Sequence, residues 1–483
     1  MSVKRSHRST KAKTAASVSV PVWVSLRRSP RFRLALALFA AAAILGYHRD
    51  VYWRAFDDHP QESTVWFHAF GFAAASTASL WPNPLVARHI DVRESQVKPY
   101  NHWPNGFFLF FEFILRIFGR TEIVGRWVAI LGTLMGFALI MISLGRDDWL
   151  VYACLPLLLL SAAGRDSVGF IFIDVALNLS MGVLLWIVAR RAGGRHYNLV
   201  FRAALLAALA CNHLIAPFAA VVILLKWRES RSARGLAIDA AILAAGFFTV
   251  LLALAAGVGS MAGGAAELLR IFRLRSHTAT GQWAGALYGE WRDLFNLGPA
   301  GALLVLAAWL VTGKVREWRT AALLPSYLLF TLLLRQYVGG HHFARLPFVF
   351  FSLLTVAVAA EITIQQIDST HLRGLMRLAA VVMLALPISA GKQQYEINLG
   401  MQISRSALAR VVGDPVQATV LEGCNAFRFE PDFREEGFDP FGLLGQFYFG
   451  QQVVNRVRRD DPIRPCTVNW ERSVVRAIPY GRQ

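Results

Sequence analysis

The sequence predicts an all-α polytopic membrane protein with about 11 transmembrane helices, a number that follows from its long apolar runs. Three observations support this fold class. Hydrophobic residues make up 55% of the 483 residues, charged residues make up 17%, and the mean hydropathy is +0.42. Such a chain is too apolar for an ordinary soluble domain. The basic residues gather in short tracts between the apolar runs, as in membrane proteins.

Residues 1–33 are rich in Ser, Lys and Arg, which predicts a disordered, basic arm ahead of the first apolar run. The run at 34–47 has the length of a signal-peptide core, but no clear small-residue cleavage site follows it, so an uncleaved anchor is favoured over a cleaved signal. Several later runs are shorter than the ~20 residues that a lone span needs. The later predicted spans are 124–144, 149–163, 168–189, 199–210, 214–225, 236–258, 297–311, 320–334, 346–360 and 378–390.

Four connections between predicted spans carry clusters of basic residues. The clusters are Arg190, Arg191 and Arg195; Lys226, Arg228, Arg231 and Arg234; Lys314, Arg316 and Arg319; and Arg373 and Arg377. Basic residues favour the cytoplasmic side, so these connections and the N-terminal arm are predicted to be cytoplasmic. Topology then explains the net charge of +19 without nucleic acid. The expected location is a bacterial inner membrane, with the C-terminus extracytoplasmic.

The predicted transmembrane domain covers residues 34–390, and three longer stretches all fall on its outer face. These are the first outer loop 49–123, the loop 259–296 and a C-terminal extracytoplasmic region, 391–483. A site assembled from loops is therefore expected on the outer side. Cys424 and Cys466 in the C-terminal region can form a disulfide in an oxidising compartment, and two free thiols are the alternative.

Two aromatic-rich segments in the first outer loop, 62–80 and 104–118, predict helices that lie at the membrane interface. The alternative is that 107–118 is a true span. That topology would invert every later loop and place the basic clusters outside, which the charge distribution disfavours.

Acidic residues open the first of these segments. Asp57, Asp58 and Glu62 lie just outside the first predicted span. A carboxylate in this place can serve as a general base toward an acceptor hydroxyl or amine. The same carboxylates can instead cap the N-terminus of the following helix.

Further motifs carry a resemblance to a known family. The loop contains KPYNHWPNG at 98–106, an apolar stretch, and FGRTEIVGRW at 118–127. This order of a His or Lys beside Pro, Phe-Gly, an acidic residue and an Arg that opens a span resembles GT-C glycosyltransferases. It is most similar to the protein mannosyltransferase group that includes the lipid A aminoarabinose transferase. The turn before Asp174 and the segment QYVGGHHFARLP at 336–347 add to the resemblance.

The resemblance implies transfer of a sugar from a polyprenyl-phosphate donor, with inversion, to a lipid, glycan or protein acceptor on the outer face. Glu62 is expected to be the catalytic base, with Asp58 second and Asp57 beside it. The family's acidic pair is only partly present, because Ser63 follows Glu62, and its Pro-Pro is here Trp103-Pro104. A non-catalytic protein that keeps the GT-C fold therefore remains an alternative.

A phosphate leaving group calls for cations on the same face. The predicted substrate-binding residues are His102, Asp174, Arg270, Arg273, His341, His342 and Arg345. The arginines can instead anchor the chain to lipid headgroups, and an ion pair with Arg165 would make Asp174 purely structural. His102 and His213 leave a divalent metal ion open, but no metal-binding spacing is present, so no metal site is assigned.

Other function classes receive less support. The sequence has no P-loop, dinucleotide-binding fingerprint, nucleophile elbow or zinc motif. A polytopic transporter or flippase is the alternative from another class, although no internal hydropathy repeat is evident. The sequence therefore favours a membrane glycosyltransferase whose partners are a lipid-linked sugar, its acceptor and membrane lipids.

Overall fold

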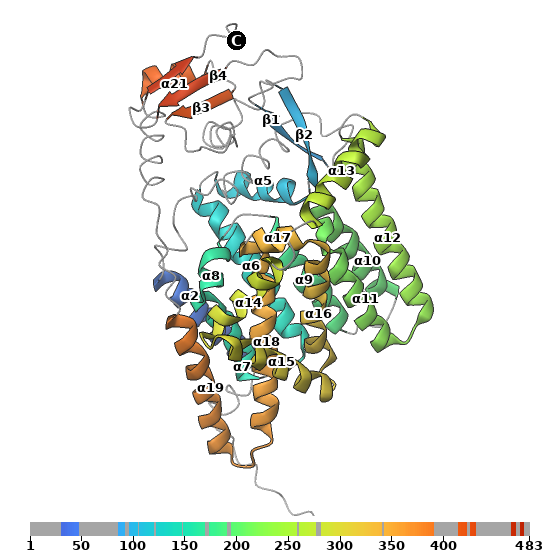
Figure 1. Cartoon of the computed structure of the whole chain (residues 1–483), viewed down its shortest axis with the longest axis vertical. Helices are drawn as coiled ribbons and strands as arrows, with labels where there is room; N and C mark the ends of the chain where they lie inside the picture. Colours follow the sequence, from blue (N-terminus) through green and yellow to red (C-terminus); the bar gives the residue numbers. More distant parts are fainter. Residues whose placement is uncertain are drawn as a thin grey trace, which may run out of the picture.

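Helices dominate the part of the chain that the structure describes, and two small β-sheets accompany them there (Figure 1). The computed structural model describes residues 30–47, 86–91, 96–104, 106–119, 122–146, 148–169, 173–190, 195–257, 260–276, 282–340, 342–390, 414–422, 426–430, 465–469 and 474–477.

The elements of the first half are α2 (Pro30–Tyr47), β1 (Val86–Asp91), β2 (Gln96–Pro104), α5 (Gly106–Phe118), α6 (Glu122–Ser143), α7 (Trp149–Leu160), α8 (Ala162–Ser167), α9 (Asp174–Ala189), α10 (Arg195–Cys211), the 3-10 helix η1 (His213–Ile215), α11 (Ala216–Ser230) and α12 (Ala233–Ala256). Those of the second half are α13 (Met261–Ser276), α14 (Gln282–Phe295), α15 (Pro299–Lys314), α16 (Trp318–Leu333), α17 (Arg335–Gly340), the 3-10 helix η2 (His342–Arg345), α18 (Leu346–Gln365), α19 (Thr370–Ala390), α21 (Pro415–Glu422), β3 (Ala426–Glu430), β4 (Pro465–Asn469) and β5 (Val474–Ala477).

Three of the described helices, α6, α12 and α18, are long and apolar enough to cross a membrane. The pair α14 and α15, which meet at an angle of 93°, would add a fourth span if counted together. Shorter apolar helices such as α7, with 12 residues, and α9, with 16, fall below the ~20 residues of a lone span. Length and composition therefore support three or four spans among the described helices, fewer than the apolar runs predicted.

The three long helices differ in how deeply they are buried. The most apolar window of α18 is 83% buried inside the protein, whereas that of α12 is only 17% buried. α18 therefore forms the centre of the bundle, with Phe348, Phe350 and Phe351 fully buried. α12 turns most of its apolar surface outward, as expected of a helix that faces lipid.

Two glycines allow α6 and α9 to approach closely. A Cβ on Gly182 would lie 2.2 Å from the carbonyl oxygen of Gly136, and a Cβ on Gly136 would lie 2.3 Å from that of Asn178. Both neighbours are backbone atoms, which cannot rotate away. Small residues let helices pack in this way inside membranes, where van der Waals contact replaces the hydrophobic effect.

We expect Gly182→Ala to separate α6 from α9 and to destabilise the protein by about 1–3 kcal/mol, the usual cost of overpacking. The measurement is the melting temperature in detergent. Gly313→Ala in α15 is the matched control, because a Cβ there meets nothing within 4 Å and alanine favours helix. Equal melting temperatures for the two variants would contradict the close contact.

Some predicted spans have different bounds in the structure. The predicted span 149–163 ends at Leu160, because Ser161 is extended (φ −71°, ψ 155°) and its hydroxyl accepts a hydrogen bond from the Gly164 N–H to cap α8. The predicted span 168–189 becomes α9 and begins only at Asp174. α9 therefore begins six residues later than the predicted span.

The predicted interfacial helix 104–118 is α5, which runs across the bundle rather than along it in Figure 1. Phe108 and Phe111 on one face are fully buried, whereas Phe113 is 59% exposed and Ile117 57% exposed. With 13 residues, α5 is too short to span alone. This geometry fits an interfacial helix better than the alternative span. The other predicted interfacial helix, 62–80, lies outside the described residues.

The connections between helices gather at two ends of the bundle. Two of the basic connections, 226–234 and 314–319, meet at one end, which we call the arginine end. There, Arg319 Nη1 donates to the Ser143 carbonyl at 2.8 Å and Arg319 Nη2 lies 2.7 Å from Glu229 Oε1. These contacts join the ends of α6 and α11 to the start of α16. Gln365 at the end of α18 bonds Asp148 at the same end.

The opposite end, which we call the hairpin end, carries α5 and the antiparallel hairpin β1–β2 (Figure 1). The small sheet of β3, β4 and β5 lies toward this same end, with β4 parallel to β3 and antiparallel to β5. Neither sheet was expected from the sequence. Cys466 lies in β4, but Cys424 is outside the described residues, so the predicted disulfide remains untested.

Candidate functional site

A buried carboxylate stands at the hairpin end of the helix bundle. Asp174 is the first residue of α9 and is 5% exposed. The Tyr337 hydroxyl, from α17, donates a hydrogen bond of 2.7 Å to Asp174 Oδ2. A carboxylate in this place needs such a partner, and the positive end of the α9 dipole favours its negative charge.

A second charged pair lies near this contact. Arg345, at the end of η2, bonds Glu290 of α14, with 2.9 Å between Nη1 and Oε1. The Arg345 Nε is buried and has no hydrogen-bond partner among the described residues. The Tyr327 hydroxyl donates a hydrogen bond of 2.7 Å to the carbonyl oxygen of Ala344, beside Arg345, and η2 follows directly on α17, which holds Tyr337. The structure therefore brings together two of the predicted residues, Asp174 and Arg345, and leaves one guanidinium donor available.

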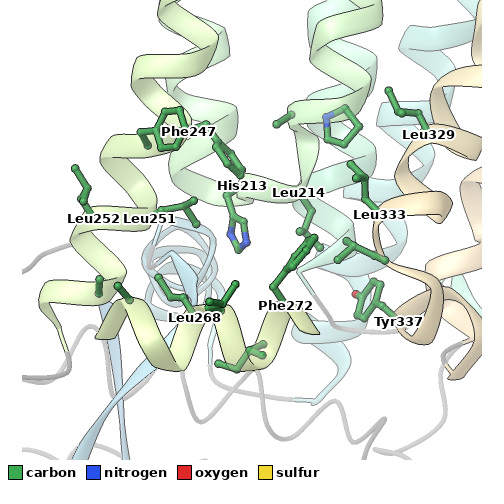
Figure 2. A pocket seen from close by; sticks show the side chains of 18 residues that line it. His213, Leu214, Phe247, Leu251, Leu252, Leu268, Phe272, Leu329, Leu333 and Tyr337 are labelled. Carbon is green, nitrogen blue, oxygen red and sulfur yellow. The ribbon is translucent and has the colours of Figure 1, made fainter. Parts of the chain in front are cut away.

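An apolar cavity of about 730 Å³ opens beside this cluster (Figure 2). Eighteen residues line it, and only His213 and Tyr337 among them carry polar side-chain groups. The walls come from η1 and α11 on one side, from α12 and α13 on another, and from α16 and α17. Figure 2 shows the His213 ring between Leu214 and Leu268, with Tyr337 on the far side of Phe272.

The cavity and the carboxylate share Tyr337. Its ring lines the apolar space, while its hydroxyl reaches out to Asp174. A ligand with a long apolar tail and a polar head would fit such a site, with the tail in the cavity and the head near Asp174. Pockets of this size, mainly apolar and with a few convergent polar groups, are typical ligand sites.

His213 is the other polar side chain of the cavity wall. Burial among apolar side chains lowers the pKa of its imidazole to about 4. The ring is therefore neutral near pH 7 and supplies no positive charge for a phosphate. The sequence left His213 open as a metal ligand, whereas the structure places it against Phe247 of α12, with 6.3 Å between ring centroids.

The predicted residues Arg270 and Arg273 lie on α13, apart from the buried cluster. Both are exposed. Arg270 makes a bidentate pair with Glu267, with two contacts of 2.7 Å, and these hydrogen bonds raise the pKa of Arg270 further. Leu269 and Phe272 of the same helix line the cavity. The two arginines therefore share α13 with cavity-lining residues, but neither lines the cavity itself.

The structure does not describe the other predicted site residues, or describes only their backbone. Glu62, Asp58, Asp57 and His341 lie outside the described residues. His102 lies in β2, within the stretch between Tyr100 and Pro104 where the hairpin register shifts, and His342 begins η2. The side chains of these two histidines are not described. Within the described ranges, no three His, Cys, Asp or Glu residues form a group suited to a metal ion.

Sequence reasoning gave no role to Tyr337 or Glu290. Tyr337 is 163 residues from Asp174 along the chain, and only basic residues of the predicted outer loop 259–296, which contains Glu290, were singled out. In the segment QYVGGHHFARLP, the sequence singled out the histidines as candidate ligands. The structure shows instead that Tyr337 of this segment makes the hydrogen bond to Asp174.

Comparisons of this chain with protein-family models, with curated proteins and with solved structures found no match.

Proposed function

We propose that this protein is a membrane glycosyltransferase that moves a sugar from a polyprenyl-phosphate donor to a lipid, glycan or protein acceptor on the outer face of a bacterial inner membrane. The proposal includes a GT-C-like bundle of about 11 membrane helices, some of them shorter than a full span. The N-terminus is cytoplasmic and the C-terminus extracytoplasmic, so the hairpin end faces outward.

The apolar cavity that ends at Tyr337 and Asp174 carries this proposal. A lipid-linked sugar is apolar along most of its length and polar only at the head, and the cavity has the same division. The cavity walls include α13 and α17, which lie toward the hairpin end in Figure 1. The basic connections lie at the other end, as expected if that end is cytoplasmic.

Each proposed role follows from the chemistry of transfer. The bond between the anomeric carbon and the donor phosphate breaks as the acceptor oxygen bonds that carbon, and the acceptor proton passes to a base. Glu62 is proposed as this base, with Asp58 second. Arg345, through its available Nε, stabilises the phosphate that leaves with the polyprenyl chain. Asp174, held by the hydrogen bond from Tyr337, accepts a hydrogen bond from a hydroxyl of the sugar.

The testing experiment measures sugar transfer from a panel of labelled polyprenyl-phosphate sugars to membrane lipid and protein. Ala265→Phe would fill part of the cavity from α13. We expect its kcat/KM for the donor to fall by roughly tenfold or more, because even two or three lost CH₂ contacts cost ~0.8 kcal/mol each.

Leu303→Phe is the matched control, since Leu303 of α15 is 66% exposed and lies outside the cavity. It should transfer as the wild type does. Equal activity in the two variants would remove the cavity from the donor site. Absence of transfer by the wild type with every donor would overturn the proposed function.

One observation favours a transporter or flippase as the second candidate. α14 and α15 meet at 93°, and the connection between them holds Asn296 and Gly298 at positive φ of 49° and 56°. Broken helices of this kind often line substrate paths in transporters. Movement of a labelled lipid-linked sugar across proteoliposomes without any acceptor would favour this candidate over transfer.

A further inference from the structure

A polar cleft of about 480 Å³ opens at the arginine end, far from the proposed donor cavity. The ends of α6 and α11 line it, together with the connection from α15 to α16. The lining residues are Leu144, Gly145, Leu225, Arg228, Glu229, Arg231, Arg316, Glu317, Trp318 and Arg319. α6 ends and α12 begins beside the cleft, and both are candidate spans, so the cleft lies at the edge of the membrane-crossing region.

The cleft has a surplus of positive charge. Four arginines face two glutamates, which gives a net charge of +2. Both glutamates already have partners. Arg319 bonds Glu229 at 2.7 Å, and Arg146, from outside the lining, bonds Glu317 at 2.5 Å. The remaining arginines of the cleft are therefore not needed to neutralise its acids.

Two of these arginines have no side-chain partner among the described residues. The guanidinium groups of Arg231 and Arg316 make no hydrogen bond or ion pair there, and both side chains are exposed. Arg228 stacks on the Trp318 ring, with 4.0 Å from its Cζ to the ring centroid. Stacking occupies the face of a guanidinium and leaves its N–H donors at the edge available.

The backbone at these two arginines is unusual. Arg231 has φ 55° and Arg316 has φ 63°, and they follow the ends of α11 and α15. Glycine is the residue that ordinarily occupies such a left-handed position, because a Cβ strains it. Residues held in this conformation cluster at functional sites. Arginine at these two positions makes the protein less stable than glycine would, and it places two guanidinium groups without a described partner in one cleft.

We propose that this cleft binds a phosphate group through Arg231 and Arg316, with Arg228 at its side. Arginine matches phosphate oxygens with paired N–H donors. The phosphate belongs to an anionic lipid headgroup at the membrane edge or to a soluble phosphate compound. The proposal goes beyond the proposed glycosyl transfer and does not depend on it.

The test measures the Kd of two probes for the full chain in detergent by calorimetry. The probes are inorganic pyrophosphate and a short-chain phosphatidylglycerol, with short-chain phosphatidylcholine, whose zwitterionic headgroup has no net charge, as the reference. Binding of pyrophosphate identifies a soluble ligand. Binding of phosphatidylglycerol alone identifies a lipid headgroup. If neither probe binds more tightly than phosphatidylcholine, the proposal is wrong.

The decisive variant is Arg231→Gly combined with Arg316→Gly. Glycine suits the left-handed backbone, so the melting temperature should stay the same or rise. The Kd of the binding probe should increase at least about tenfold, because two guanidinium groups no longer donate hydrogen bonds to the phosphate. Arg234→Gln combined with Lys314→Gln removes the same charge from the same end, outside the cleft. An equal increase in Kd in both double variants would overturn the proposal.

A second double variant separates the geometry of the guanidinium from its charge. Arg231→Lys with Arg316→Lys keeps both charges but loses the paired N–H donors. We expect its Kd to lie between those of the wild type and of the glycine double variant. A wild-type Kd in both the lysine and the glycine variants would contradict the assignment of these two arginines.

Discussion

Glu62→Gln is expected to lower the kcat for sugar transfer by about 10²–10⁴-fold, the usual contribution of a general base. Glutamine keeps the size of the side chain but cannot take the acceptor proton. The measurement is initial-rate transfer from the donor that the wild type uses, in membranes with matched protein levels. Asp58→Asn is the companion variant, and full activity in both would exclude the acids of this loop as the base.

Asp174→Asn, tested in the same assay, separates sugar binding from proton transfer. Asn is uncharged and replaces one acceptor oxygen with an N–H₂ donor, so Tyr337 and a sugar hydroxyl can no longer each donate to a separate carboxylate oxygen. We expect kcat/KM to fall by about 10–100-fold, which matches the loss of one hydrogen bond to a charged group. A larger loss in Asp174→Asn than in Glu62→Gln would transfer the role of base to Asp174.

The fold shows which features of a membrane helix can be predicted from sequence. Apolar runs located α6 and α12 to within a few residues. The predicted span 346–360 ends just before Glu361, whereas α18 continues to Gln365. Glu361 is fully buried and bonds Arg377 of α19, so its charge does not end the helix. Partners of this kind cannot be inferred from hydropathy.

A site residue could be predicted from the sequence only where its residue type was by itself unusual for its surroundings. Asp174 stood out because a carboxylate beside an apolar run is costly without a partner. Its partner Tyr337 did not stand out, since a tyrosine near the end of a span is ordinary there. The apolar cavity was also beyond prediction, because its walls come from helices far apart in sequence and each wall residue looks like a lipid-facing one.

The largest loss of stability is expected from Asp239→Ala. Asp239 in α12 is 1% exposed and bonds two cations, Arg202 of α10 at 2.8 Å and Lys226 of α11. Lys226 is itself buried and lies 4.4 Å from the centroid of the Phe201 ring. Removing the carboxylate would leave both cations without their shared counter-ion.

We expect Asp239→Ala to lower the free energy of unfolding by about 3–5 kcal/mol, which is the usual cost of removing one partner of a buried ion pair. The measurement is an SDS titration of the purified protein. Asp293→Ala is the matched control, because it breaks an exposed pair with Arg292 and should leave the unfolding midpoint unchanged.

Replacing all three groups of the buried cluster together distinguishes two explanations. If the loss in Asp239→Ala comes from uncompensated charge, then Arg202→Met, Lys226→Met and Asp239→Leu combined should recover most of it, since well-packed apolar groups can replace a buried ion pair. If the triple variant is as unstable as Asp239→Ala, the ion cluster itself holds α10, α11 and α12 together. Recovery would instead show that packing holds these helices and that the charges only have to balance.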